Sequence, residues 1–464
     1  MEIRLRRRPG RLTKRLPAAA AVGAAVLVGA LVVLPPERGR APAPAPGPAA
    51  QARSAVAAGQ PAALPALTAL IGEQEARSRA RPADARTWAV LGTAYVERGR
   101  RTGDGADYPR AERALRTALR LDASPAALEG LAALAVARRD YSAAKRWAEA
   151  ARERAPGRWT AQALLIDACT GLGDIDGAGR ALERMTKLRS SPAVSARAAA
   201  VYRDRGWRED AAARISDAAA AAGTPAERAA YLEQAGQLAF ERGDREGALR
   251  FFEEALRTDP DLRAARAGQG RALAALGRTT QALGAYRAAL ARQPRAEYAL
   301  ELGELYESLG LGQAARAQYE LLRERVRAAV AGGVDEGLLL GRFEADHGDP
   351  EAAVRRLEAE WRRRPSTAAA DALGWALYRA GRTGQALRYA TRATDADLGG
   401  AVRSAPYAYH RGVIEWALGR YGPARRHLAE ALRINPYFSP LHAPRARGAL
   451  AALGEPPLED PPAS

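Results

Sequence analysis

The string of residues most suited to catalysis or ligand binding is Asp346-His347-Gly348-Asp349-Pro350. A histidine between two carboxylates can act as a general acid or base, or as a metal ligand. The competing interpretation is structural. Gly348 would form a turn between two helices, and Asp349 would cap a helix that begins at Pro350. His347 would then end the preceding helix, where a positive charge suits the helix dipole. We favour the structural turn.

The other residues capable of chemistry lack the spacing that an active site or a metal site requires. The four histidines form no metal-binding pair, and no glycine-rich phosphate-binding loop follows a strand. A single cysteine, Cys169, excludes an intramolecular disulfide and a cysteine-based metal site. The stretch 103–107 (GDGAD) lacks the spaced acids of a calcium loop and is typical of a turn. The sequence therefore predicts no metal, no cofactor and no catalytic residue.

The charge of the chain is strongly basic but dispersed. The net charge is +18, from 71 basic and 53 acidic residues, and residues 1–16 alone carry seven basic groups and one acid. The rest of the excess is mixed with acids along the chain, as expected of solvated helix faces. Nucleic-acid binding would need a clustered basic stripe, and none is present outside the N-terminus. We therefore predict no nucleic-acid partner.

The N-terminus has the pattern of a membrane-targeting segment. Residues 17–34 are apolar and uncharged, and eighteen helical residues span roughly 27 Å, close to the thickness of a bilayer core. We predict a transmembrane helix with residues 1–16 as a basic cytoplasmic tail and the rest of the chain outside the membrane. The alternative is a signal peptide that is cleaved to release the protein. The Pro/Ala-rich residues 35–60 predict an extended linker.

Beyond the linker, a period of 34 residues organises the chain. It relates two stretches residue by residue: Gly243, Ala248, Phe252, Ala255 and Pro260 recur as Gly277, Ala282, Tyr286, Ala289 and Pro294. Small residues let two helices approach closely, glycine permits a tight turn, and proline ends the second helix. The abundance of Ala, Leu, Arg and Glu favours helix, so the pattern predicts an all-α stacked array.

The first clear unit carries Trp88, Leu91, Gly92 and Tyr95, followed by Ala111. At these spacings the chain resembles the tetratricopeptide repeat family. The resemblance implies two antiparallel helices per repeat, stacked into a right-handed α-solenoid. About ten repeats would fill residues 61–438, with a degenerate one at 192–225. We expect a capping helix at 439–456 and a disordered tail at 457–464.

The resemblance also implies which positions of each first helix face a ligand. In the early repeats these positions hold small or polar residues: Ala89, Thr93, Val96, Glu129, Ala133 and Val136. In the last two repeats they hold Asp371, Trp375, Tyr378, Tyr409 and Trp416. Because aromatic side chains anchor peptides on binding surfaces, we take these last five as the candidate partner-binding residues. The competing interpretation is that the aromatics pack between neighbouring repeats.

These features together predict a non-enzymatic scaffold whose groove binds a protein or peptide on the outer side of the cytoplasmic membrane. One alternative is an accessory subunit of an envelope assembly or transport system, with its groove packed permanently on a partner. A more remote alternative is a hydrolase or transferase that uses the residues 346–349. The set of Lys and Asn residues by which chaperone-binding members hold a carboxylate is absent, so a chaperone tail is not the expected partner.

Overall fold

The computed structural model describes residues 46–398 and 400–454. Within these residues the chain forms 23 α-helices and one short 3-10 helix, with no strand, which confirms the all-α prediction. The predicted basic tail, the apolar segment 17–34 and the tail 457–464 lie outside the described residues. No helix in the described part is long and apolar enough to cross a bilayer.

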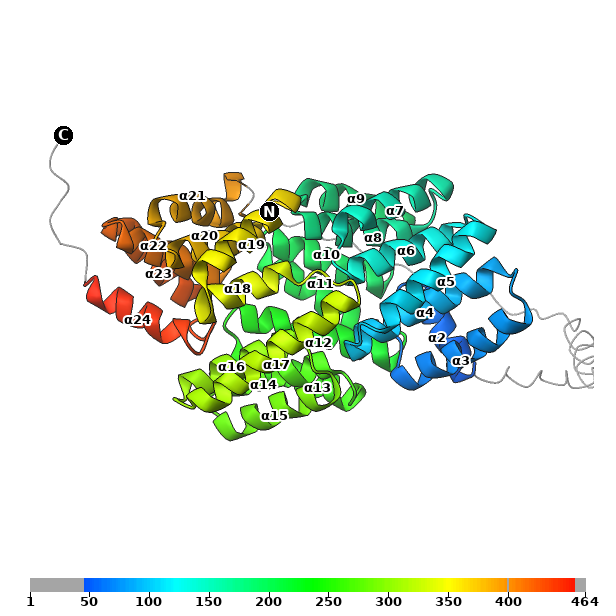
Figure 1. Cartoon of the computed structure of the whole chain (residues 1–464), viewed down its shortest axis with the longest axis horizontal. Helices are drawn as coiled ribbons and strands as arrows, with labels where there is room; N and C mark the ends of the chain where they lie inside the picture. Colours follow the sequence, from blue (N-terminus) through cyan, green and yellow to red (C-terminus); the bar gives the residue numbers. More distant parts are fainter. Residues whose placement is uncertain (1–45, 399, 455–464) are drawn as a thin grey trace, which may run out of the picture. The chain divides into compact units, whose positions relative to one another are not determined.

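Ten helix pairs make up most of the compact unit that begins at Gly47. The first helices of the pairs are α4 Ala85–Thr102, α6 Pro125–Ala137, α8 Trp159–Leu172, α10 Pro192–Asp204, α12 Pro225–Glu241, α14 Arg263–Ala275, α16 Ala296–Ser308, α18 Gly337–His347, α20 Thr367–Arg379 and α22 Ala405–Ala417. The second helices are α5 Asp107–Leu121, α7 Tyr141–Arg154, α9 Ile175–Leu188, α11 Arg208–Ala220, α13 Arg245–Thr258, α15 Thr279–Arg292, α17 Gly312–Ala331, α19 Pro350–Arg363, α21 Thr383–Thr394 and α23 Tyr421–Ile434. Consecutive helices pack on each other, with α17 and α18 joined through the rings of Tyr319 and Phe343, as is typical of a solenoid (Figure 1).

Further helices flank the ten pairs. The C-terminal helix α24, His442–Ala452, falls within the segment predicted as a cap, and the 3-10 helix is Ala396–Leu398. At the other end, α2 (Pro48–Ala57) and α3 (Leu64–Ala80) pack on each other and on α4. The prediction of an extended linker is therefore wrong for residues 48–57. Proline at the first position starts α2, and small apolar side chains then bury one of its faces.

Glycine and one large side chain set the distance between stacked helices. The ring of Phe252 on α13 is fully buried between Gly236 on α12 and Gly268 on α14. A Cβ atom at Gly236 would lie 2.7 Å from this ring, and one at Gly268 would lie 2.4 Å from it. Neither contact is sterically possible without a shift of the helices. The alternation of small and large residues in the sequence thus fixes the stacking directly.

Glycine also forms the turn within most pairs. Gly173, Gly243, Gly277, Gly381 and other turn glycines have positive φ, as the short link between antiparallel helices requires. At the same position after α6 the chain has Arg139, whose φ is 61°, and Arg139 is the one non-glycine residue with positive φ in the described part. A left-handed conformation costs a residue with a side chain about 1–2 kcal/mol.

Contacts across the array account for this conformation of Arg139. Its guanidinium forms ion pairs with Glu297, at 2.6 Å, and with Glu336. Its backbone carbonyl accepts a hydrogen bond of 2.8 Å from Arg364. These partners follow Arg139 by 158, 197 and 225 positions, so they belong to pairs several repeats further along. The helix array therefore coils back on itself, and successive turns of the coil touch.

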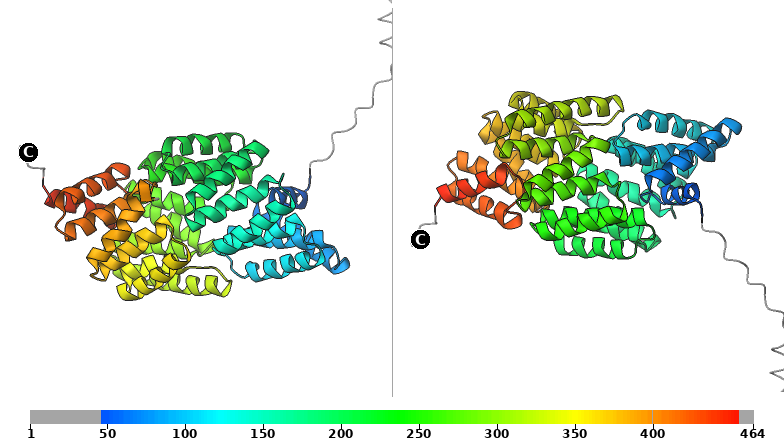
Figure 2. Two further views of the ribbon diagram at one scale, coloured as in Figure 1. Left: turned by 90° about the horizontal axis from the view of Figure 1, so that it is seen from above. Right: turned by 90° about the horizontal axis from the view of Figure 1, so that it is seen from below.

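Further polar contacts join the same turns. Arg101 and Asp259, both almost fully buried, form an ion pair of 2.5 Å. The side-chain amide of Asn435 donates a hydrogen bond of 2.8 Å to the carbonyl of Phe240, and both residues are buried. Figure 2 shows the coiled helices from two further sides, with the pairs following one another from blue to red. The fold is thus held by packing between neighbouring helices and by a second set of contacts between successive turns of the coil.

The packing around Phe252 predicts opposite effects for two glycine substitutions. Gly268→Ala forces a methyl group against the buried ring and should destabilise the fold by roughly 1–3 kcal/mol. Gly284→Ala, in an exposed helical position with open space around it, should be neutral or stabilising by about 0.5–1 kcal/mol. Thermal unfolding followed by circular dichroism compares the two. Equal effects would show that the close approach at Gly268 does not govern the stacking.

The inter-turn contacts predict that Arg139→Ala loosens the coil, because Glu297 and Glu336 lose a shared cation. We expect a lower unfolding temperature and a larger radius of gyration by small-angle X-ray scattering. Arg139→Gly should be less harmful by about 1 kcal/mol, since glycine adopts positive φ without strain. Arg316→Ala, at an exposed arginine of α17, is the control. An unchanged radius in Arg139→Ala would contradict the role of the contact.

Candidate functional site

The first helices of the early repeats enclose a cavity of about 980 Å³, which we call the N-terminal cavity. Its walls come from α4, α6, α8, α10 and α12, and the end of α2 closes one side. All six early-repeat residues that the family resemblance predicted to face a ligand line this cavity: Ala89, Thr93, Val96, Glu129, Ala133 and Val136. These six positions therefore line one shared cavity, and their role in binding stays a prediction.

Most charges in the N-terminal cavity are already paired. Arg158 forms an ion pair with Glu129, which also accepts a hydrogen bond from the hydroxyl of Thr160. Arg197 pairs with Asp167 at 3.0 Å.

Glu233 on α12 is different, because it is half-buried and has no ion-pair partner among the described residues. Burial raises the pKa of Glu233 to about 7, against the opposing effect of Arg271 and Arg295.

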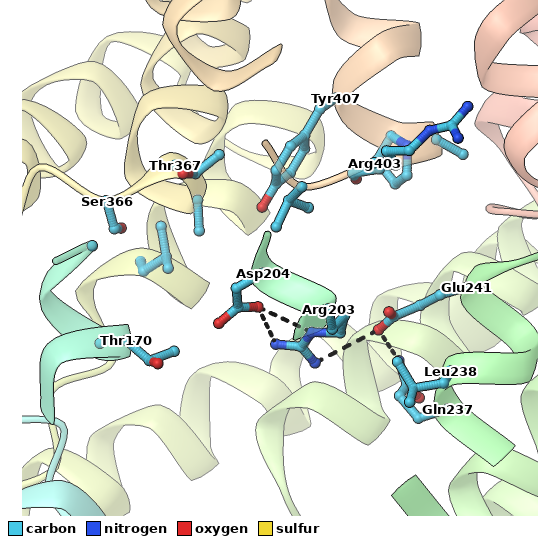
Figure 3. A pocket seen from close by; sticks show the side chains of 18 of the residues that line it. Thr170, Arg203, Asp204, Gln237, Leu238, Glu241, Ser366, Thr367, Arg403 and Tyr407 are labelled. Atoms are coloured by element: carbon cyan, nitrogen blue, oxygen red, sulfur yellow. Dashed lines mark hydrogen bonds and ion pairs between the residues drawn. The ribbon is translucent and has the colours of Figure 1, made fainter. Parts of the chain in front are cut away.

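A second cavity of about 670 Å³, which we call the central cavity, lies where the turns of the coil meet. Figure 3 shows Arg203 in this cavity between the carboxylates of Asp204 and Glu241, at 2.9 Å and 4.0 Å, while the hydroxyl of Tyr407 points inward.

Three other arginines of the central cavity, Arg208, Arg242 and Arg342, have no carboxylate within ion-pair distance in the described part of the chain. Burial, together with the nearby Arg403 and Arg242, lowers the pKa of Arg208.

The two cavities meet at α12, and several residues line both. The shared residues are Tyr141, Thr170, Gly171, Arg203, Gln237 and Leu238. Along α12, Glu233 lies in the N-terminal cavity, Gln237 at the junction, and Arg242 in the central cavity. We call the two cavities together the channel. Its two ends differ in charge, with an unpaired acid at one end and unpaired arginines at the other.

The five residues predicted from the last two repeats lie elsewhere. Asp371, Trp375 and Tyr409 are buried, and Tyr378 and Trp416 are half-buried. None of the five lines either cavity of the channel. Nothing in the structure tests whether they bind a partner, so that role stays a prediction.

The buried members of this set hold the end of the array together. Trp375 donates a hydrogen bond of 2.9 Å to Asp346 and stacks on His410, with 4.2 Å between the ring centroids. His410 is in turn hydrogen-bonded to Asp371 at 2.9 Å. From the capping helix α24, His442 stacks on Tyr409 at 5.1 Å. Aromatic stacking and hydrogen bonds thus join α18, α20, α22 and α24.

The string at 346–350 forms the predicted structural turn. His347 ends α18, Gly348 follows it, and the Asp349 side chain caps α19, which begins with Pro350. The His347 ring is buried, stacks on Tyr319 at 4.5 Å, and lies 3.2 Å from Glu307. No group of three or more side chains able to hold a metal ion occurs in the described residues.

Sequence reasoning missed the channel residues of the middle repeats. Glu233 and Gln237 occupy the same two positions in their repeat as Ala89 and Thr93 in the first. Both could therefore have been predicted from the ligand-facing positions of the family. Arg208 and Arg242 could not have been predicted in this way. These residues follow the first helix, and they reach the central cavity only because distant turns touch.

The C-terminal cluster predicts an effect of pH on the capping helix. Burial lowers the pKa of His442 to about 4, and His410 and Arg445 reinforce this effect while Asp346 opposes it. The unfolded segment therefore binds more protons between pH 6.5 and 4, and stability falls as the pH falls through this range.

Hydrogen–deuterium exchange of residues 442–452, corrected for the intrinsic rate, should rise severalfold between pH 7 and pH 5. His442→Phe, which keeps the ring, should remove the increase, and His427→Phe should keep it. A wild-type rate independent of pH would contradict this assignment.

Comparisons with known proteins agree with the repeat architecture. Two family models, both described as tetratricopeptide repeat, match residues 239–300 and 372–437. No curated protein matches the chain.

Among solved structures, human IFIT1 bound to PPP-AAAA is 17% identical with a TM-score of 0.46, covering 68% of this chain and 73% of that one. MamA is 20% identical with a TM-score of 0.30, covering 36% and 97%. Yeast Tom70 is 13% identical with a TM-score of 0.34, covering 78% and 96%.

The two matched segments contain α13 to α15 and α21 to α23 with part of α20, the parts of the array nearest the 34-residue pattern. The two matched segments are tetratricopeptide repeats, and they belong to an array of ten stacked helix pairs.

Proposed function

We propose that this protein is a scaffold that binds a segment of another protein in the channel. Tetratricopeptide repeats indicate a protein-interaction scaffold, and the repeat fold is in general non-catalytic. The observation that supports the site is the N-terminal cavity, whose walls are the first helices of five successive repeats. Its size lies within the range of cavities that bind ligands in proteins.

The walls of the channel suit a peptide in extended conformation. Small side chains such as Ala126, Ala133 and Thr93 leave room for a peptide main chain. The paired charges are held by neighbouring helices rather than by the ligand, so the channel needs little rearrangement on binding. A preformed site costs less conformational entropy, which favours affinity.

The proposal places the scaffold on the outer side of the cytoplasmic membrane. Its support is the apolar run 17–34 with the basic residues before it. A permanent role in an envelope assembly is the alternative, in which the channel would be filled by a fixed partner.

A second candidate surface is the pair Tyr378 and Trp416. Both rings keep part of their area accessible, and both occupy ligand-facing positions of the family pattern. In the channel proposal these residues contribute nothing to binding. Tyr378→Ala with Trp416→Ala therefore separates the two surfaces.

The test uses a photo-crosslinking amino acid in the intact protein, expressed in its own cells. At Gln234, an exposed residue of the N-terminal cavity, crosslinking should yield a discrete adduct with one protein. At Ala213, exposed on α11 outside both cavities, it should not.

Filling the channel with Ala133→Trp should reduce the Gln234 adduct at least tenfold, and Ala126→Trp provides a second variant at an exposed position. The double variant of Tyr378 and Trp416 should leave the adduct unchanged. Adducts that survive both channel substitutions in folded protein would overturn the channel as the binding site.

A further inference from the structure

We propose that the segment bound in the channel is dipolar: an extended peptide with a basic side chain about four residues from an acidic one. The basic side chain lies against Glu233 in the N-terminal cavity, and the acidic one among Arg208, Arg242 and Arg342 in the central cavity. This inference rests on the proposed function and specifies the chemistry of the partner.

Helix α12 sets the spacing of the two charges. It runs from one cavity to the other, with Glu233 near its middle and Arg242 directly after its end. Nine residues of helix separate the two positions by about 13.5 Å along the axis at 1.5 Å per residue, and by about two and a half turns around it. An extended peptide therefore needs about four residues or slightly more, at roughly 3.3 Å each, to pass from one charge to the other.

The acidic end of the channel calls for a cation from the ligand. Glu233 has no ion-pair partner among the described residues, whereas Arg158 and Arg197 of the same cavity are each held by a carboxylate. The raised pKa of Glu233 shows that its charge is poorly compensated within the protein. The other unpaired charges of this cavity, Arg86 and Asp122, are exposed and of opposite sign.

The basic end calls for an anion. Half-buried Arg208 donates a hydrogen bond of 2.9 Å to the backbone carbonyl of Glu241, has no ion-pair partner among the described residues, and lies near the cations Arg242 and Arg403. Arg403 is held by Glu430 at 3.0 Å, while the exposed Arg242 and Arg342 have no such partner in the described part of the chain and leave a net positive charge at this end. A carboxylate from the ligand would relieve the repulsion among these guanidinium groups.

Between the two ends, Arg203 stands at the junction, paired with Asp204 and 4.0 Å from Glu241, so its charge is already neutralised within the protein (Figure 3). The side-chain amide of Gln237 donates a further hydrogen bond of 3.1 Å to Glu241. A segment with charge of one sign would meet repulsion at one end of the channel, which disfavours a polyanion such as nucleic acid.

The experiment selects peptides from a random dodecapeptide display library on the intact protein. Sequences enriched on the wild type, relative to Ala133→Trp, should pair Lys or Arg with Asp or Glu at a spacing of about four. Selection on Glu233→Gln should lose the basic preference and keep the acidic one. Selection on Arg208→Gln/Arg242→Gln should do the reverse.

For one enriched peptide, Glu233→Gln should weaken binding about tenfold by isothermal titration calorimetry, and the exposed control Glu253→Gln should not. Enrichment that depends on an open channel but shows no charge pattern would overturn the dipolar ligand and leave the proposed function standing. No enrichment over Ala133→Trp would overturn both. A charge pattern unchanged in the Glu233 and arginine variants would likewise overturn this inference alone.

Discussion

The contact between successive turns of the coil is the interaction on which the central cavity depends. The first helices of successive repeats line the N-terminal cavity, and contacts between distant repeats add the central cavity beside it. Arg139 is central to these contacts. Its side chain and its carbonyl both bind residues of the neighbouring turn, and its positive φ accompanies these contacts. The array accepts a strained residue at a position where most other pairs have glycine. The ion pairs with Glu297 and Glu336 offset that strain.

The same contact explains the distribution of charge in the channel. Arginines that reach across to the next turn bind either carboxylates, as Arg101 binds Asp259, or backbone carbonyls, as Arg364 binds that of Arg139. Among the cavity-lining charges without an ion-pair partner in the described part of the chain, Glu233 and Arg208 are half-buried, whereas Arg242 and Arg342 are exposed. A half-buried unpaired charge beside a cavity is costly to the free protein, so Glu233 and Arg208 indicate where a ligand would supply the missing charge.

Local features of the chain could be predicted from the sequence, and long-range ones could not. The 34-residue period, the turn glycines and the cap formed by Asp349 depend on residues close together in the chain, and the structure contains them. The helix at 48–57 was not predicted, because its alanines continue the Pro/Ala-rich composition of the segment before it. The central cavity was missed for a deeper reason. It joins residues such as Asp204 and Tyr407, about six repeats apart, and no periodic pattern reveals which turns of a coil meet.

The aromatic residues of the last two repeats show the limit of transferring positions from a family. The transferred positions lie on the correct helices, yet Trp375 and Tyr409 are buried against their neighbours and against His442. The most direct test of the channel as the binding site is a crystal structure of the protein with a bound peptide. The account predicts electron density for an extended chain that passes Arg203 and contacts both Glu233 and Arg242. Density over Tyr378 and Trp416, with the channel empty, would contradict it.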